Sequence, residues 1–309
     1  MRRFAAMSTW PQLPLGEWAD TYGTLHRWTQ MVGKTRLALA PKQNHWWHTT
    51  LYVTARGLGT SPIPYAGGTF EIEFDFLDHR LLARTSEGST RSIALAPRAV
   101  ADFYDEYIRM LAALGITARI WPVPVEMADR LPFTQDRAHA AYDGDAAQRC
   151  WRILTHTDRV LKQFRGRFLG KSSPSHFWWG SFDLACTRFS GRRAPPHPGG
   201  IPNCPDYVTL EAYSHECISA GWWPGNEGGP VAEPAFYAYA YAEPPGSRDA
   251  AVRPAAAAYH PVLHDWILPY EAVRTAPDPD RMLLEFLQST YEAAAERGGW
   301  DRAQLERAE

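Results

Sequence analysis

The hydrophobic pattern of the first 120 residues predicts a helix, then strands, then a second helix. Apolar residues recur every three or four positions in the helical segments and alternate with polar residues in the strands. In order, the predicted elements are a helix at 18–39, strands at 49–54, 69–76, 80–84 and 91–95, and a helix that begins at Pro97 and ends at Gly115.

The alternation is strictest at residues 69–76. One face of this predicted strand is entirely apolar, which indicates that it faces a core, and the acids on the other face are expected to face solvent. The apolar face carries Phe70, Ile72, Phe74 and Phe76, and the acidic face carries Glu71, Glu73 and Asp75.

The second half repeats this order of elements. The pattern predicts a helix at 147–168, strands at 177–188, 207–218, 236–242 and 266–272, and a helix at 280–297. When the two halves are aligned without gaps, Arg36 aligns with Arg167, His45 with His176 and Trp47 with Trp178. We therefore predict an α+β fold in which two similar helix, four-strand, helix halves arose by internal duplication and pack as one unit. The first half is 1–120, the linker 121–145 and the second half 146–309.

Composition and charge exclude several classes of protein. Of the 309 residues, 45% are hydrophobic and 13% aromatic, which supplies enough apolar surface for a core and excludes a disordered chain. The formal net charge of -2 provides no basic excess for binding nucleic acid. No apolar run reaches the roughly 18 to 20 residues of a membrane-spanning helix. We therefore expect a small-molecule ligand, neither nucleic acid nor membrane as a partner, and either a monomer or a homo-oligomer.

The cysteines and the first residues indicate the compartment. The sequence has four cysteines: Cys150, Cys186, Cys204 and Cys217. They are too few and too irregularly spaced for a disulfide scaffold or a zinc site. Arg2 and Arg3 are followed at 10–17 by prolines and a charge rather than by the apolar segment of a signal peptide. We expect a cytoplasmic protein with free thiols.

A polar run in the second half marks a candidate site. Where strand 69–76 is apolar, the predicted strand 207–218 has Ser214 and Glu216 on the corresponding face. A buried, unpaired carboxylate is costly unless it gains a partner or a changed pKa, and a general base has this property. Glu216 is therefore a candidate base or metal ligand, with Tyr213 and His215 beside it.

The neighbouring predicted strands add aromatic and polar candidates. Gly180 within 177–188 allows a ligand to approach the backbone closely, and 236–242 carries a row of tyrosines on one face. Aromatic side chains with a few polar groups are the usual lining of a small-molecule site. The candidates for substrate binding are Trp178, Trp179, Trp222, Tyr237 and Tyr239.

These residues support the hypothesis of an acid-base enzyme, a hydrolase or lyase that acts on a small polar or aromatic metabolite. In this hypothesis Glu216 is the base or a metal ligand, Asp183 orients a histidine, and Arg188 binds a carboxylate or phosphate of the substrate. The remaining catalytic candidates are proton carriers, ligands or hydrogen-bond donors: His215, His176 and Tyr213. The pattern identifies no cofactor and no metal.

Structural roles are the alternative for many of these residues. His45 and His176 recur at matching positions of the two halves, which favours hydrogen bonding within the fold, and tryptophans are equally typical of a core. The protein is then a non-catalytic small-molecule-binding protein, or a scaffold whose aromatic surfaces mediate oligomerisation. The sequence contains no phosphate-binding loop and no H-E-x-x-H, G-x-S-x-G or G-x-G-x-x-G motif that would decide between these readings.

Four segments have an unusual and specific composition. They are Asn44-His-Trp-Trp-His48, His176-Phe-Trp-Trp-Gly-Ser-Phe-Asp183, Tyr213-Ser-His-Glu216 and Pro234-Ala-Phe-Tyr-Ala-Tyr239. They resemble segments of a bacterial family of about this length that is known only as a domain of unknown function, and the resemblance extends over almost the whole chain. It implies one full-length unit, and it implies no activity, cofactor or catalytic residue.

Overall fold

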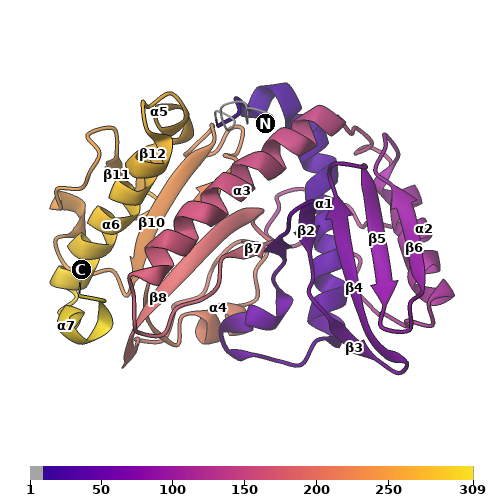
Figure 1. Ribbon diagram of the computed structural model, residues 1–309, viewed down its shortest axis with the longest axis horizontal. Helices are drawn as coiled ribbons and strands as arrows, with labels where there is room; N and C mark the ends of the chain where they lie inside the picture. The colour runs from indigo at the N-terminus through magenta and orange to yellow at the C-terminus, as the bar shows by residue number, and fades with distance from the viewer. Residues whose placement is uncertain (1–9, 309) are drawn as a thin grey trace, which may run out of the picture.

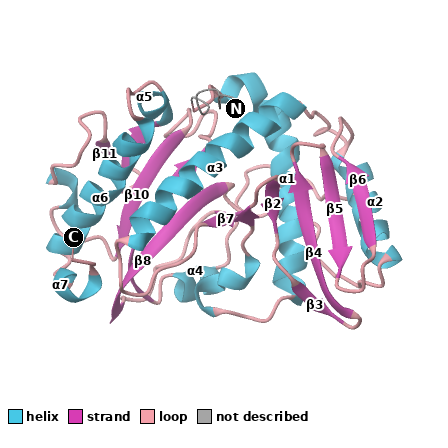
Figure 2. Cartoon of the chain, viewed as in Figure 1, coloured by secondary structure: helices cyan, strands magenta, loops and turns pink. Residues whose placement is uncertain are grey.

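The computed structural model describes residues 10–308 and has the α+β fold that the hydrophobic pattern predicts. Two antiparallel six-stranded sheets lie side by side, with helices packed on them (Figure 1, Figure 2). The helices in this part of the chain are α1 (Leu15–Leu39), α2 (Val100–Ala113), α3 (Gly144–Gly166), α4 (Asp206–Ala212), α5 (Tyr270–Arg274), α6 (Pro279–Arg297) and α7 (Arg302–Leu305), and the 3-10 segments are η1 (Asn44–Thr49) and η2 (Ser247–Asp249).

The first sheet forms from the strands that the alternating pattern predicts. Its strands are β1 (Tyr52–Val53), β2 (Gly57–Gly59), β3 (Ile63–Tyr65), β4 (Gly68–Asp75), β5 (Arg80–Thr85) and β6 (Thr90–Ala94), in the order β1-β2-β4-β5-β6 with β3 paired to β4. The register pairs Phe70 with Thr85 and Phe74 with Leu81. As predicted, the apolar face of β4 is buried, and α2 packs on this sheet.

The second sheet has one face covered by helices and one face open to a cavity. Its strands are β7 (His176–Trp178), β8 (Asp183–Arg193), β9 (His215–Trp223), β10 (Ala235–Tyr241), β11 (Ala258–His260) and β12 (Asp265–Pro269), in the order β11-β12-β10-β9-β8-β7. The helices α3 and α6 pack on β8, β9 and β10 from one side, and α3 runs diagonally across the front of Figure 1. Leu184, Ile218 and Phe236 point toward these helices and are buried.

The two sheets meet at one pair of residues. Leu51, just before β1, and Phe177 of β7 exchange both backbone hydrogen bonds, at 2.9 and 2.8 Å. Both side chains are fully buried in a hydrophobic cluster that includes residues of both halves. This pair joins the edges of the sheets, so that the second sheet continues from the first.

Helix α1 is buried along most of its length, although much of its sequence is polar. Its residues from Thr24 to Arg36 are all buried. At Gly33 an added Cβ would lie only 2.1 Å from Cδ1 of Trp179, so the indole ring packs directly on the helix backbone. The absence of a side chain at Gly33 therefore allows the segment between β7 and β8 to contact α1.

Several predicted strands are wrong. Residues 177–188 form two strands, β7 and β8, because the chain turns at 179–182, where Phe182 has a φ of 60°. Residues 207–212 belong to α4, which starts after Pro205, so only the end of the predicted strand 207–218 lies in β9. Part of 266–272 is α5, and part of 49–54 belongs to η1. Apolar and polar residues happen to alternate at 207–212, although this segment is a short helix. Alternation with a period of two is typical of a strand and therefore predicted the wrong element here.

The solvent-facing role predicted for Asp75 is also wrong. Asp75 is 2% exposed, and its Oδ1 accepts hydrogen bonds from the backbone N–H groups of Leu77 and Asp78. Its Oδ2 pairs with Arg56 Nε at 2.5 Å. The carboxylate closes the turn after β4, and a buried carboxylate needs partners of this kind.

The boundary between halves and the internal duplication stay predictions. Each half contains a long helix that leads into an antiparallel sheet, but the pairing of β3 with β4 in the first sheet has no equivalent in the strand order of the second. Arg2 and Arg3 lie outside the described residues. Within 10–308, none of the helices is both long and apolar enough to cross a membrane.

The packing of Trp179 on α1 gives a test with a matched control in the same helix. The Gly33→Ala substitution should lower the free energy of unfolding by about 1 to 3 kcal/mol, because its methyl group overlaps the indole ring. Gly16→Ala, where a Cβ meets no atom within 4 Å, should be neutral or stabilising by up to about 1 kcal/mol. Urea denaturation measures both values, and equal stability of the two variants would show that Trp179 does not pack on this helix.

Candidate functional site

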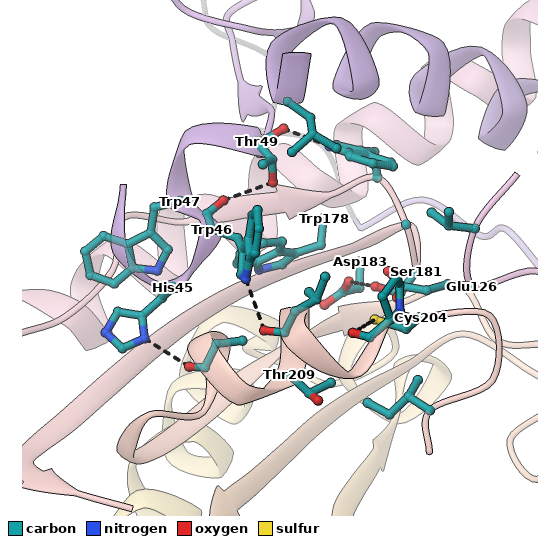
Figure 3. A pocket seen from close by; sticks show the side chains of 18 of the residues that line it. His45, Trp46, Trp47, Thr49, Glu126, Trp178, Ser181, Asp183, Cys204 and Thr209 are labelled. Carbon is teal, nitrogen blue, oxygen red and sulfur yellow. Dashed lines mark hydrogen bonds between the residues drawn. The ribbon is translucent and has the colours of Figure 1, made fainter. Parts of the chain in front are cut away.

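A cavity of about 550 Å³ lies on the face of the second sheet that α3 and α6 leave uncovered. Its floor consists of alternate residues of three strands: Asp183, Ala185, Thr187 and Phe189 of β8, Cys217 and Ser219 of β9, and Tyr237 and Tyr239 of β10. Its walls come from η1, α4, the end of α1 and the segment 119–126. Figure 3 shows the side chains of Trp46 and Trp178 beside Asp183, Ser181 and Glu126. The volume is typical of a site for a small organic molecule.

Three polar residues of α1, spaced four apart, hold two segments of the cavity wall. Gln30 forms two hydrogen bonds with the backbone of Val125, donating to its carbonyl oxygen at 2.8 Å and accepting from its N–H at 2.9 Å. Lys34 Nζ donates to the carbonyl oxygen of Val123 at 2.9 Å. Residues spaced four apart share one face of a helix, so these groups and His26 form a stripe along α1.

His26 holds the turn between β7 and β8. Its Nε2 lies 3.0 Å from the carbonyl oxygen of Trp179 and 2.9 Å from that of Gly180. Burial lowers the pKa of His26 to about 4, so the ring is neutral at pH 7. Because carbonyl oxygens only accept, we assign the ring proton to Nε2. The stripe of α1 thus fixes both the turn that precedes Asp183 and the segment that ends in Glu126.

The carboxyl groups of Glu126 and Asp183 both line the cavity, where the charge of Asp183 acts on Glu126. The Glu126 carboxyl is packed against Gly180, where an added Cβ would be 2.2 Å from its Oε1. Glu126 lines the cavity and is exposed there, while the protein around its carboxyl group excludes part of the solvent. This enclosure raises the pKa of Glu126 to about 7, and the Asp183 carboxylate contributes to the increase. A carboxyl group with a pKa near 7 exchanges protons readily at neutral pH.

Asp183 differs from Glu126 because it accepts two hydrogen bonds from neutral donors. The Ser181 hydroxyl donates to Oδ1 at 2.5 Å, and the Tyr237 hydroxyl donates to Oδ2. Burial raises the pKa of Asp183 to about 6, and these two bonds limit the increase because they favour the ionised form. A further hydrogen bond of 2.9 Å joins the hydroxyls of Tyr213 and Tyr239 on the cavity floor.

The cover of the cavity is attached by side-chain hydrogen bonds between η1 and α4. Trp46 Nε1 donates to the carbonyl oxygen of Val208 at 3.1 Å, and His45 Nδ1 donates to that of Ala212 at 3.0 Å (Figure 3). The other nitrogen of His45 accepts from Lys171 Nζ at 2.7 Å. His45 therefore forms hydrogen bonds within the fold, as the alternative hypothesis of a structural role predicts.

Left-handed backbone conformations are concentrated around this cavity. Non-glycine residues rarely adopt a positive φ, and where they do the strain is often associated with a binding or catalytic site. Three cavity residues have this conformation, His45 (φ 56°), Trp46 (φ 61°) and Glu126 (φ 55°), and so do Phe182 and Asn203 beside them. The strain supports a functional role for the cavity.

The structure places part of the predicted site in this cavity. The candidates that line it are Asp183, Tyr213, Trp178, Trp179, Tyr237 and Tyr239. Asp183 is hydrogen-bonded to a serine and a tyrosine rather than to the histidine that the hypothesis requires. His176 is buried beside the cavity, with its ring edge-on to Trp178, and burial lowers its pKa to about 3. The catalytic and binding roles of these residues stay predictions.

Other candidates lie elsewhere in the fold. Glu216 is outside the cavity and forms an ion pair of 2.7 Å with Arg192, which also donates to backbone carbonyls after α6. Trp222 is fully buried on the opposite face of the sheet. His215 begins β9 and contacts the ring of His45 from outside the cavity lining. Glu216 is therefore held as part of an ion pair rather than aimed at a ligand in the cavity.

Arg188 does not bind a ligand in this cavity, because its side chain points to the helix-covered face of the sheet. It is 0% exposed, and its guanidinium lies 3.4 Å from the ring centroid of Phe164 and 4.2 Å from that of Tyr291. Its Nη2 donates to the carbonyl oxygen of Phe164. The alternation along β8 explains this position, since even-numbered residues of the strand face α3 and odd-numbered residues face the cavity.

The sequence patterns missed Glu126 and Lys34. Glu126 follows no periodic signal, because it lies in an irregular segment that the pattern treats only as a linker. Lys34 has a weak signal, because it follows His26 and Gln30 at the helical spacing of four. Burial lowers the pKa of Lys34 to about 8. Within residues 10–308 no group of three or more His, Cys, Asp or Glu side chains is placed to hold a metal ion.

The raised pKa of Glu126 predicts that stability depends on pH at this residue. The folded protein favours protonated Glu126, so this contribution is complete below the ordinary pKa near 4.5 and is lost as the pH rises through about 7. Glu126→Gln should therefore raise the melting temperature, relative to the unsubstituted protein, by about 1 °C at pH 8.5, and by less at pH 5.5.

Thermal unfolding followed by circular dichroism at the two pH values measures this difference. Glu87→Gln, at an exposed turn after β5, is the matched control and should show the same small effect at both. An equal effect of Glu126→Gln at both pH values would contradict the enclosure of this carboxyl group.

Comparison with known proteins confirms the resemblance to a family of unknown function over almost the whole chain. No curated protein and no solved structure matches the chain. The model of one protein family matches residues 10–307, nearly the whole length. This match shows that the chain belongs to a family of unknown function, DUF5996.

Proposed function

We propose that the protein is an enzyme that binds a small organic molecule in the cavity and carries out acid-base chemistry with Glu126 and Asp183. The observation that supports this proposal is the pair of interacting carboxyl groups in one ring-lined cavity, with their pKa values raised to about 7 and about 6. Raised carboxyl pKa values inside a cavity are typical of catalytic acids and bases.

The hydrogen bonds assign different roles to the two groups. Asp183 accepts from Ser181 and Tyr237, which stabilise its charge, so it acts as the base. The side chain of Glu126 has no hydrogen-bond donor in the described part of the chain, so it retains its proton to a higher pH and acts as the acid. One group accepts a proton from the substrate or water while the other donates one to the departing atom, as hydrolysis and elimination require.

The cover formed by η1 and α4 supports this chemistry by enclosing the reactants. Trp46 and Trp47 of η1 line the cavity with Trp178 and Trp179, so large rings share this space with the two carboxyl groups. Limiting the access of water strengthens electrostatic interactions within a site. The tyrosines of the floor supply hydroxyl groups that orient polar atoms of a bound molecule.

We also propose that the protein works in a reducing compartment, the cytoplasm. Its four cysteines are free thiols, and Cys150, Cys186 and Cys217 are buried. Burial raises the pKa of the Cys186 thiol to about 11, which keeps it protonated and unreactive. The thiols therefore act as apolar packing groups in this proposal.

The proposed roles predict which substitutions abolish turnover. In a mixture of small metabolites followed by mass spectrometry, the protein should deplete at least one compound. Glu126→Gln and Asp183→Asn should each slow the depletion by about 100-fold or more, because each removes a proton-transfer group while preserving its shape. Circular dichroism checks that the variants remain folded.

Glu216→Gln distinguishes this proposal from the site first expected from the sequence. It removes the ion pair with Arg192 outside the cavity, so turnover should persist. Loss of turnover in Glu216→Gln together with full turnover in Glu126→Gln would refute the proposal. Ligand binding without any depletion would instead favour the non-catalytic binding protein.

A further inference from the structure

Among the described residues neither cavity carboxyl group has a cationic partner, in contrast to two other buried aspartates of the protein. Asp136 is 0% exposed and forms an ion pair of 2.9 Å with Arg27, and buried Asp75 is paired with Arg56. Within residues 10–308 neither Glu126 nor Asp183 forms an ion pair. A buried carboxylate such as that of Asp183 needs compensation for its charge. Ser181 and Tyr237 supply hydrogen bonds to it, but no cationic side chain of the described residues pairs with it.

Lys34, a cationic residue that lines the same cavity, is engaged with other groups of the wall. Its ammonium group donates to the carbonyl oxygen of Val123 and lies 5.1 Å from the ring centroid of Trp121 and 5.9 Å from that of Trp179. Arg119, which also lines the cavity, is exposed. The position next to Glu126 and Asp183 is therefore available for a positive charge that a ligand brings.

The rings around this position favour the same kind of ligand. Tyr237 and Tyr239 line the same cavity, and the Tyr237 hydroxyl is hydrogen-bonded to Asp183. The rings of Trp46 and Trp178 also line it (Figure 3). The faces of aromatic rings attract organic cations, and cavities that combine such rings with carboxylates recognise ammonium groups. An anionic molecule would be repelled by the Asp183 carboxylate, and by that of Glu126 whenever it is ionised.

We propose that the substrate of this site is a small organic cation, an amine or a quaternary ammonium compound, whose positive group lies between Glu126 and Asp183. This inference rests on the proposed function for the location of the reaction and adds the chemical class of the substrate. The cation supplies the missing compensation for the carboxylates and contacts the rings with its apolar part. Proton transfer then takes place beside the charged group of the substrate.

Four probes of similar size test the charge of the ligand. Isothermal titration calorimetry on the full chain at pH 7.5 compares 2-phenylethylamine, phenyltrimethylammonium, neutral 2-phenylethanol and anionic 3-phenylpropionate. At least one of the two cations should bind about tenfold or more tightly than the alcohol, and the propionate should bind most weakly. The ratio between the two cations distinguishes an amine site from a quaternary ammonium site.

Substitutions show whether the carboxyl groups produce this preference. Asp183→Asn and Glu126→Gln should each weaken cation binding by about tenfold and leave binding of the alcohol within about twofold. Asp105→Asn, an exposed acid on α2, is the matched charge control and should change neither. Equal binding of cation and alcohol, a preference for the propionate, or no cation binding up to about 10 mM would overturn the inference.

These outcomes are separate from those of the turnover experiment. If the alcohol or the propionate binds best while depletion still requires Glu126 and Asp183, the acid-base function stands and the cationic substrate does not. If the cations bind through these residues while Glu126→Gln and Asp183→Asn keep full depletion, the site recognises cations and the catalytic roles fail.

Discussion

The burial of a polar helix is the constraint on which the cavity depends. Helix α1 lies in the interior, yet its sequence contains His26, Gln30 and Lys34, and each of these groups needs a hydrogen-bonding partner there. The partners are backbone groups of two irregular segments, which lack the ladder bonds of a sheet. The hydrogen bonds that these helix side chains require therefore fix the turn before Asp183 and the segment that ends in Glu126. The positions of the two carboxyl groups follow from this mutual requirement.

The two faces of the second sheet serve different purposes. On one face, α3 and α6 cover apolar residues and stabilise the fold by burial. On the other face, η1, α4 and the segment 119–126 form a cover that leaves a space. Loops and short segments seldom pack as closely as long helices, and they carry binding sites in many folds. A rigid floor with an irregular cover is the arrangement that the proposed function uses.

The fold was more predictable from the sequence than the site was. Strand β4, the helices α3 and α6, and strand β10 have a clear period, and each lies close to its predicted range. The prediction failed at α4 and at the turn between β7 and β8, because seven residues are too few for a helical period to emerge and Gly180 lies inside an otherwise strand-like run. Asp183, Tyr237 and Tyr239 were found as polar or ring residues on strands, whereas Glu126 has no such context.

The sequence by itself determined the long, regular elements such as β4, β10, α3 and α6, and the apolar face of β4, because these properties depend on neighbours a few positions apart. Only the tertiary structure decided that Glu126 lies beside Asp183, that Glu216 pairs with Arg192, and that Arg188 faces the helices. Each of these is a contact between segments that are distant in the sequence, and their approach depends on the packing of the whole fold rather than on any local pattern.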